Sequence, residues 1–509
     1  MKYIYVISLL GLMVFWSSCR NDFESEPSNG RLEFSRDTVF LDTIFSNIGS
    51  STYNLKIYNR SDQDINIPSI RLGRGENSEY RLNVDGLAGK SFEDIQILAK
   101  DSIFVFVETT IDINNFQNPD DAFLYTDQIL FDTGGNEQKV ELVTLVQDAI
   151  FLFPKDLGDG MFETLTLGEG EDAVQIEGFF LEDDELNFTN EKPYVIYGYA
   201  AVRSGKTLIV NAGARVHFHA DSGILIANNG SIKVNGTAST DAALQENEVI
   251  FESDRLEPRF SNVPGQWGTI WMTAGSTDNE FNFTTIKNAS VGLLMDSNDG
   301  DRTLTLRNVQ IYNSANTGLL AKTGNIYGEN VVINNSSQYA FLGSLGGKYE
   351  FNHCTFANYW SNSFRSTPAV QLTNFLQISN TEVVVADLIQ ADFTNCIIYG
   401  NERREIGLSQ EPSAQFNFNF KNSLIRFQDE TGQFENNPLY DFNNTSIYSN
   451  IILNQDPSFN NADRNNFNIE KDVSGAENIG LQNIQPPIDL NLKNRMNPPD
   501  AGAYESVNF

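Results

Sequence analysis

Six stretches of sequence decide the fold, because they share a weak pattern of apolar and small polar residues at fixed places. They read FNFTTIKN (Phe281–Asn288), LRNVQIYN (Leu306–Asn313), GENVVINN (Gly328–Asn335), FNHCTFAN (Phe351–Asn358), FTNCIIYG (Phe393–Gly400) and FKNSLIRF (Phe420–Phe427). The sixth position is apolar in every copy, and from Ile286 to Ile425 it recurs after 25, 22, 23, 42 and 27 residues. A period in the low twenties is typical of a solenoid.

Inside each copy the apolar and polar residues alternate, as at Leu304 and Leu306, which is the period of a β-strand. No helical period runs long enough for a helical repeat. The sequence therefore predicts short parallel strands joined by turns, with each coil about 4.8 Å above the last. We expect the interval of 42 to be one coil with a surface insertion, since Tyr359–Thr367 has a loop-like composition. Two coils are the alternative.

Equivalent residues of such a fold stack along its axis. One slot holds Asn308, Asn330, Asn395 and Asn422, with His353 in the fourth copy. Side-chain amides in this slot can hydrogen-bond the coils above and below. We interpret His353 as a satisfied core group rather than as a ligand.

Another slot of the repeat holds two cysteines, Cys354 and Cys396, which therefore point inward from equivalent strands. We expect both to be buried thiols that pack as small hydrophobic side chains. A disulfide between adjacent coils is the alternative, because the coil spacing fits the usual Cα separation.

The composition excludes two classes of partner. The chain has 509 residues, a formal net charge of −33 and an isoelectric point near 4.3, with only 34 Lys and Arg residues. Nucleic acids and anionic lipid surfaces both require a basic footprint, which this chain lacks. The acidic residues are spread along the sequence, which is typical of a soluble extracellular protein.

The N-terminus predicts export. Lys2 precedes an apolar run from Ile4 to Trp16, which is too short to span a bilayer and predicts a signal peptide over residues 1–18.

The residues around Cys19 predict lipid attachment. Ser17-Ser18-Cys19 resembles the lipobox of bacterial lipoproteins, which implies lipidation of Cys19, although Trp16 stands where most lipoboxes carry Leu. The acidic residues that follow resemble the surface-export signal of Bacteroidetes lipoproteins. We therefore expect residues 19–30 to tether the chain to the outer membrane, on its cell-surface or periplasmic face. A plain secretory signal is the alternative.

Residues 31–148 predict a separate all-β module. Apolar residues alternate with polar ones between turn clusters such as Asn59–Asp62 and Thr133–Asn136. About seven short strands over about 115 residues predict an immunoglobulin-like (Ig-like) β-sandwich. The stretch Leu32–Ser61 is similar to the Ig-like modules of the abnormal-spindle and hydin type, which implies scaffolding or spacing. The apolar positions are Leu32, Phe34, Val39, Leu41, Leu55, Ile57, Ile65, Ile67, Ile103, Val105, Val107, Ile129, Phe131, Val140 and Leu142.

The rest of the chain predicts one long domain. Residues 149–192 are acidic and weakly patterned, and we expect them to form a connection and an N-terminal cap. From Pro193 the sequence resembles bacterial right-handed parallel β-helix repeat proteins of the pectate-lyase-like superfold. This implies a β-helix over residues 193–505 and does not specify an activity. The matching stretches are Val195–Ala238, Pro264–Met272, Asp456–Ile469 and Pro498–Glu505.

Parallel β-helices include polygalacturonases and pectate lyases, so a polysaccharide lyase or glycoside hydrolase is the alternative to a binding protein. Hydrolysis needs clustered Asp residues, and the polygalacturonase motifs Asn-Thr-Asp, Gly-His-Gly and Arg-Ile-Lys are absent. Elimination needs an acidic calcium site and a base. The best basic candidates are Arg403 and Arg404, between Glu402 and Glu405, which also fit a solvated, self-paired loop.

The sequence does not predict a metal site. Asp296–Asp301 resembles a calcium loop only superficially, because Asp301 and Arg307 stand where an EF-hand carries Gly and Glu. His217 and His219 lie two residues apart in a strand, but no third ligand is nearby. We expect no cofactor, with calcium required only under the lyase alternative.

Aromatic residues supply the best candidate binding surface. Trp267 and Trp271 occur in a strand-like segment, and we expect them to pack inside or against a cap. Tyr359 and Trp360 on the predicted insertion are the candidates for stacking against sugar rings.

The weak candidate ligand-binding residues are therefore Tyr359, Trp360, Arg403 and Arg404. The sequence predicts a surface lipoprotein with a non-catalytic binding or display module for a glycan or a surface protein.

Overall fold

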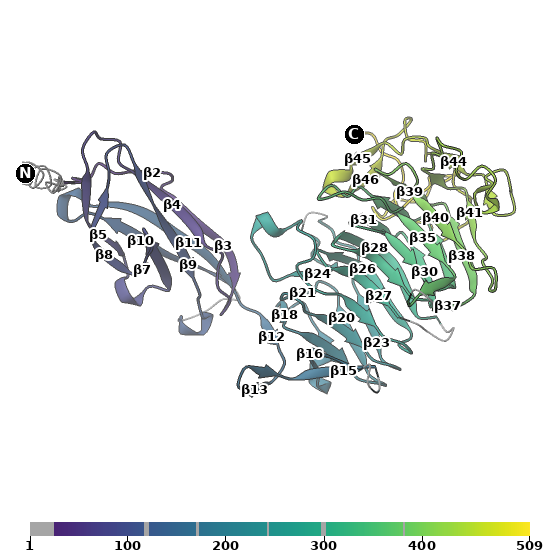
Figure 1. Cartoon of the computed structure of the whole chain (residues 1–509), viewed down its shortest axis with the longest axis horizontal. Helices are drawn as coiled ribbons and strands as arrows, with labels where there is room; N and C mark the ends of the chain where they lie inside the picture. Colours follow the sequence, from purple (N-terminus) through teal and green to yellow (C-terminus); the bar gives the residue numbers. More distant parts are fainter. Residues whose placement is uncertain are drawn as a thin grey trace, which may run out of the picture. The chain divides into compact units, whose positions relative to one another are not determined.

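The computed structural model describes residues 25–116, 122–168, 170, 173–241, 244–296, 302–379 and 382–509. The predicted signal peptide and Cys19 lie outside these residues. The described residues form β-strands and single-turn 3-10 helices, which confirms the all-β class. The chain divides into two compact units, Met1–Asp148 and Ala149–Phe509 (Figure 1). The 3-10 helices are η1 (Gly75–Asn77), η2 (Ile113–Asn115), η3 (Gly134–Asn136), η5 (Asp183–Glu185), η6 (Pro258–Phe260), η7 (Pro438–Tyr440) and η8 (Ala462–Arg464).

The first unit contains two sheets that share one core. Every apolar position predicted to point inward is buried, except Phe34 and Ile65, which pack against the core while partly exposed. The six-stranded sheet comprises β1 (Glu26–Pro27), β5 (Ile65–Leu72), β8 (Ser91–Ile97), β10 (Ala122–Phe131), β11 (Gln138–Gln147) and β3 (Thr38–Phe45). The five-stranded sheet comprises β2 (Glu33–Phe34), β4 (Tyr53–Tyr58), β9 (Ser102–Thr109), β6 (Tyr80–Val84) and β7 (Leu87–Gly89).

The second unit is a stack of parallel strands arranged in two long sheets (Figure 1). The ten-stranded sheet comprises β15 (Thr164–Leu167), β16 (Val174–Phe180), β19 (Tyr199–Val202), β22 (Gly223–Ile226), β25 (Ile270–Met272), β27 (Val291–Met295), β29 (Thr317–Ala321), β32 (Phe341–Gly343), β35 (Val370–Thr373) and β40 (Ile406–Ser409). The nineteen-stranded sheet comprises β12 (Ile150–Leu152), β17 (Asn187–Phe188), β18 (Tyr194–Ile196), β20 (Thr207–Asn211), β21 (Arg215–Phe218), β23 (Ser231–Asn235), β24 (Val249–Ser253), β26 (Asn279–Lys287), β28 (Leu304–Ser314), β30 (Asn325–Glu329), β31 (Val332–Ser336), β33 (Gly347–Asn352), β34 (Thr355–Asn358), β38 (Leu388–Thr394), β39 (Ile397–Gly400), β41 (Asn419–Lys421), β42 (Leu424–Ile425), β43 (Tyr448–Ser449) and β44 (Ile452–Leu453).

Parallel pairing begins before Pro193, where the sequence predicted only a connection and a cap. Strand β12 pairs with β18, β16 pairs with β19, and β17 pairs with β20. The hairpin of β15 and β16 is antiparallel and starts the ten-stranded sheet. A second hairpin, β13 (Asp156–Gly158) with β14 (Met161–Phe162), precedes it. The first coil therefore contains residues of this segment. Its strands are only two to seven residues long, which is too short to show a clear alternation in the sequence.

The repeat positions lie in register, as predicted. Ile286 pairs with Ile311, Ile311 with Ile333, and Phe356 with Ile398. The 42-residue interval is therefore one coil, which confirms the predicted insertion. It contains a second insertion that was not predicted, the antiparallel hairpin of β36 (Phe375–Gln377) and β37 (Val383–Val385).

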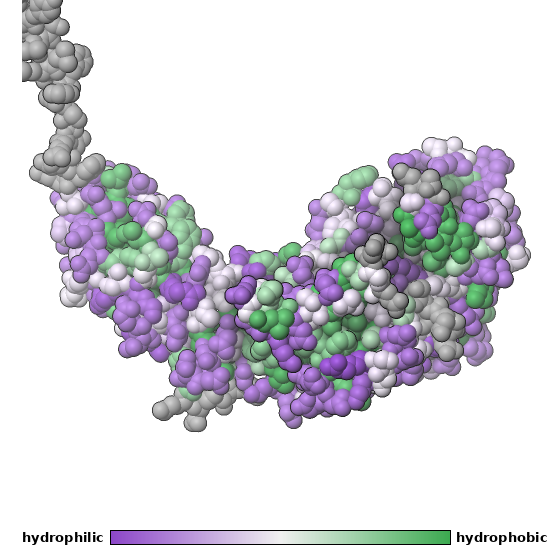
Figure 2. Space-filling view, turned by 60° about the horizontal axis from the view of Figure 1, so that its bottom comes forward, coloured by the Kyte–Doolittle hydropathy of each residue, from purple (hydrophilic) through white to green (hydrophobic). Residues whose placement is uncertain are grey.

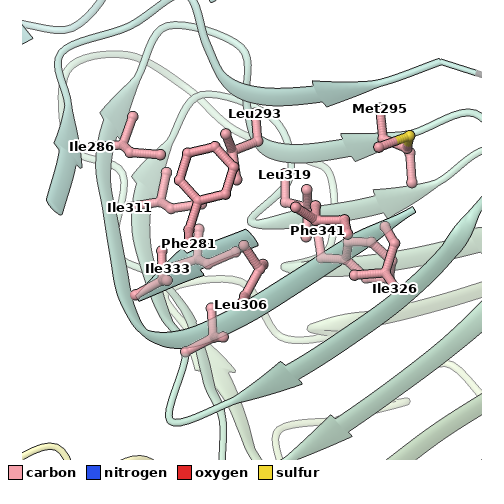
Figure 3. Packing of buried hydrophobic residues seen from close by; sticks show 14 of the residues in the cluster. Phe281, Ile286, Leu293, Met295, Leu306, Ile311, Leu319, Ile326, Ile333 and Phe341 are labelled. Atoms are coloured by element: carbon pink, nitrogen blue, oxygen red, sulfur yellow. The ribbon is translucent and has the colours of Figure 1, made fainter. Parts of the chain in front are cut away.

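The apolar repeat positions form a continuous core inside the second unit. Phe281, Ile286, Leu306, Ile311 and Phe341 are each 0% exposed. Figure 3 shows these side chains meeting in one interior from strands on either side of it. Because each coil contributes the same slots, each apolar side chain packs on its equivalents above and below.

The predicted Asn slot is a turn in the left-handed region of the backbone. Asn308, Asn330, His353, Asn395 and Asn422 have φ values of 56°, 51°, 53°, 55° and 48°. Asn tolerates this conformation better than other residues with a β-carbon. Asn330 donates to Asn308 (2.9 Å), and Asn395 Nδ2 lies 2.9 Å from His353 Nε2, which confirms hydrogen bonding between coils.

The same slot also holds the C-terminal segment, residues 479–505, against the stack. Asn422 donates to the carbonyl of Ile479 (2.8 Å), and Asn395 exchanges two hydrogen bonds with the backbone of Leu481 (2.9 and 2.6 Å). Asn330 donates to the carbonyl of Ile488 (3.0 Å). The segment therefore crosses successive coils in the direction opposite to the chain that formed them.

Cys354 and Cys396 are free, fully buried thiols. Each donates to a nearby carbonyl, Cys354 to Asn352 (3.3 Å) and Cys396 to Thr394 (3.4 Å). In-register residues of parallel strands keep their Cβ atoms about 4.8 Å apart, beyond the 3.5–4.5 Å that a disulfide needs. This geometry favours two thiols over the disulfide alternative.

We expect no thiol to react with Ellman's reagent in the folded Asn21–Phe509 fragment, because burial prevents access and raises the pKa of Cys354. In denaturant, two thiols per chain should react. A chain that stays unreactive in denaturant without a reductant would show that the disulfide forms.

Candidate functional site

A polar groove lies on the outer face of the nineteen-stranded sheet. Tyr327 on β30, Glu350 on β33 and Asp392 on β38 are in-register neighbours. Asn352 and Thr394 are also paired in register, on the same face. Together with residues 483–485 of the C-terminal segment and Gln390, these side chains line a cavity of about 360 Å³.

The alternation of each strand sends these side chains outward. Tyr349 and Phe351, on either side of Glu350, are 0% exposed and belong to the core. Ala391 and Phe393, on either side of Asp392, are also 0% exposed. The acidic side chains are therefore held on rigid strands rather than on loops, with a spacing set by the coils.

Amide and hydroxyl groups orient the carboxylates of the groove. Asn352 donates to Glu350 (3.2 Å), Gln390 donates to Asp392 (2.7 Å), and Tyr327 donates to Glu329 (2.5 Å). Desolvation is the main cause that raises the pKa of Tyr327, and the hydrogen bond to Glu329 raises it further. Each carboxylate keeps lone pairs that can accept further hydrogen bonds.

Sequence reasoning missed these residues, although a signal was present. The position immediately before each repeat copy points outward, and in consecutive copies it holds Glu280, Thr305, Tyr327, Glu350, Asp392 and Asn419. Aligning the copies by their apolar positions would have shown this polar row.

Arg403 and Arg404, the predicted basic candidates, lie elsewhere, on an exposed turn after β39. They line a cavity of about 400 Å³ with Glu402 and Glu430. Arg403 forms an exposed ion pair with Glu430. Arg404 donates to Gln433 (3.0 Å) and lies 4.9 Å from the ring centre of Phe434.

The prediction that Tyr359 and Trp360 form an exposed stacking platform is wrong. Trp360 is 7% exposed, and its indole donates to Ser363 (2.9 Å). The ring of Tyr359 packs against Phe459 and Phe467, at 6.2 and 6.4 Å between ring centres. Trp360 is therefore buried, and Tyr359 is partly exposed with its ring packed against other aromatic side chains, so the two do not form an exposed platform.

Trp267 packs inside, as expected, and Trp271 packs against residues of the N-terminal hairpin. Trp267 is 1% exposed and stacks on Phe218 at 4.2 Å. Trp271 contacts the cluster that contains Leu165.

The histidines are engaged in local hydrogen bonds. His217 lies 2.9 Å from the carbonyl of Ser253. His219 lies 2.7 Å from a carboxylate oxygen of Asp254, and this hydrogen bond raises the pKa of His219. No group of three or more His, Cys, Asp and Glu residues suited to a metal ion occurs among the described residues. Of the acidic stretch Asp296–Asp301, only Asp296 is described, and it pairs with Lys322 at 3.6 Å.

Figure 2 shows a surface that is mainly hydrophilic, with hydrophobic residues gathered in patches. No helix in the described part of the chain has the length and apolar character needed to cross a membrane.

Comparison with known proteins adds little to this geometry. No family model matches the chain, and no curated protein matches it. Among solved structures, a family 123 glycoside hydrolase from Clostridium perfringens, studied for glycolipid glycan hydrolysis, aligns with a TM-score of 0.16 and 9% identity. The alignment covers 23% of this chain and 26% of that one, and so low a TM-score supports no inference about fold or function.

Proposed function

We propose that this chain is a bacterial outer-membrane lipoprotein, anchored through Cys19, whose β-helix binds glycan without modifying it. The first unit then acts as an Ig-like spacer, and the second unit is a right-handed parallel β-helix. The repeat register and the sequence resemblance of residues 193–505 to β-helix repeat proteins support this proposed fold. A surface protein is the other class of partner.

The observation that supports glycan binding is the row of polar side chains in the groove. Carboxylates, amides and a phenol are held there on neighbouring strands, each with hydrogen-bonding capacity to spare. Sugar hydroxyls both donate and accept hydrogen bonds, so they match such a surface. The rigid strands supply this match without the entropy cost of ordering a loop.

Binding fits the groove better than catalysis. Both Glu350 and Asp392 accept a hydrogen bond from a neighbouring amide, which orients them as hydrogen-bond acceptors for a ligand. One nearby cation is engaged as well, because Arg307 pairs with both Glu280 and Glu329.

One observation favours the alternative, a polysaccharide lyase or glycoside hydrolase. Glu350 and Asp392 lie side by side on adjacent strands, and Lys348 is exposed two residues before Glu350 on the same face. Two carboxylates and a base are the parts that a lyase would use, with calcium as its cofactor.

The test is affinity gel retardation of the Asn21–Phe509 fragment by plant and host polysaccharides. We expect the double variant Glu350→Gln/Asp392→Asn to weaken retardation about tenfold, since it replaces charge-assisted hydrogen bonds by neutral ones. Asp463→Asn, an exposed carboxylate outside the groove, is the matched control and should change nothing.

The same incubations are assayed for reducing ends and for absorbance of unsaturated products, with and without calcium. Product formation that disappears in the double variant would replace the binding function by the enzymatic alternative. Equal retardation of the double variant and the parent would remove the groove from the proposal.

A further inference from the structure

A second cavity, of about 350 Å³, lies between the stack and two loops of the C-terminal segment. Its polar walls comprise His353, Gln482, Asn483, Gln485, Arg495 and Asn497, and we call it the amide cavity. The four amide side chains form no hydrogen bond with other described residues. They are therefore available to a ligand, and each offers both a donor and an acceptor.

Two buried N–H groups beside this cavity have no acceptor. His353 is 1% exposed, and its Nε2 faces the amide donor of Asn395 at 2.9 Å, which places the ring proton on Nδ1. Nδ1 has no partner. The backbone of Asp500 and of Gly502 lies close to the ring and favours its charged form. A buried donor without an acceptor is rare and calls for a ligand or a water.

Arg495 supplies the second unpaired donor. Its terminal nitrogens bond to Glu505 (3.0 Å) and Asn330 (2.6 Å), while its Nε is buried without a partner. The side chain is only 6% exposed, so the Nε cannot be satisfied by bulk water.

The charges around the cavity exclude an anion. Glu505 neutralises Arg495, and the buried carboxylates of Asp489 and Asp500 also act on it. The cavity therefore has unpaired donors but no excess positive charge. A neutral ligand rich in hydroxyl groups fits this chemistry, and Met496 and Pro499 supply apolar surface for its C–H groups.

The amide cavity adjoins the groove, because Asn483, Ile484 and Gln485 line both. We propose that the amide cavity binds one neutral sugar residue, as a terminal or branch unit of the glycan held in the groove. Its volume is at the lower end of the range for ligand sites, which suits one residue rather than a chain. This inference rests on the proposed glycan-binding function.

The test is NMR of the full chain labelled with ¹⁵N-histidine. The chain contains three histidines, so His353 is resolved from His217 and His219 by the variant His353→Asn. Glucose, galactose, mannose, N-acetylglucosamine and inorganic phosphate are added separately. We expect at least one sugar to shift the Nδ1 resonance of His353 with saturation, and phosphate to leave it unchanged.

A double variant, Gln482→Ala/Gln485→Ala, should weaken binding of that sugar about tenfold. The control Gln410→Ala, which removes another exposed amide side chain, should leave the affinity unchanged. If no sugar shifts His353 while polysaccharides still retard the protein, the amide cavity is not a sugar site and the groove proposal stands. If a monosaccharide shifts His353 without retardation by any polysaccharide, the groove proposal fails and the cavity stands. A shift by phosphate alone would overturn the neutral-ligand assignment.

Discussion

Replacing Arg365 by Met is expected to destabilise the second unit by about 3–5 kcal/mol, because it leaves a buried carboxylate without its partner. Arg365 and Glu405 are both 0% exposed in their side chains and form a two-pronged ion pair, at 2.8 and 3.0 Å. Arg365 also donates to the carbonyl of Asn358 (2.7 Å) and to Asn401 (2.7 Å). It thus fixes the first insertion of the 42-residue coil to the stack.

The loss should depend on pH. Burial raises the pKa of Glu405, and Arg365 opposes this shift. Without Arg365 the folded carboxyl binds its proton more tightly than the unfolded one does. The variant therefore loses stability as pH rises above 4.5, where the unfolded carboxyl ionises freely.

Urea unfolding followed by Trp fluorescence measures this effect, because Trp267, Trp271 and Trp360 all belong to the second unit. The matched control is Arg403→Met, which breaks an ion pair whose side chains are 66% and 60% exposed and should cost less than about 1 kcal/mol. The double variant Arg365→Met/Glu405→Leu should recover much of the loss, since no unpaired charge remains. Similar stabilities of the two arginine variants would contradict the prediction.

The repeat could be predicted from sequence because its physics is local and periodic. An apolar residue such as Ile311 recurs at the same place in each coil, and Asn308 recurs where the turn requires a left-handed backbone. Both requirements act within a few residues, so they appear in the sequence directly. The alternation of the first unit is visible for the same reason.

The ion pair and the path of the C-terminal segment over the stack could not be predicted in this way. Arg365 and Glu405 are 40 residues apart, and nothing in either neighbourhood indicates that the loop of Arg365 folds inward. Asn330 donates a hydrogen bond to Ile488, 158 residues later in the chain, and this contact depends on where the C-terminal segment packs on the stack. Trp360 illustrates the converse error, since a loop-like composition suggested exposure while the loop packs against the stack.

The second large effect concerns His353, the residue that stands in place of Asn in the repeat. We expect the parent chain to lose roughly 1.4 kcal/mol of stability per pH unit below pH 6.5 relative to the variant His353→Asn. Burial, together with the nearby positive charge of Arg495, lowers the pKa of His353 to about 2. The unfolded imidazole takes up a proton as pH falls below its ordinary pKa, while the folded one stays neutral. Acid therefore stabilises only the unfolded chain, and stability is lost as pH falls.

Asn is the matched replacement because it tolerates the φ of 53° and occupies the same slot in the other copies of the repeat, at Asn308, Asn330, Asn395 and Asn422. Urea unfolding of both proteins between pH 4.5 and 6.5 gives the two slopes. His219 provides a control of opposite sign: its hydrogen bond to Asp254 raises its pKa, so its contribution is present below pH 6.5 and is lost as pH rises through the folded value. Removing it with His219→Gln should lower stability by a small and nearly constant amount below pH 6.5, because the ring is half exposed, and should leave the slope in this range unchanged. Parallel curves for the parent and His353→Asn would mean that the buried imidazole is protonated in the folded chain, with an acceptor at Nδ1.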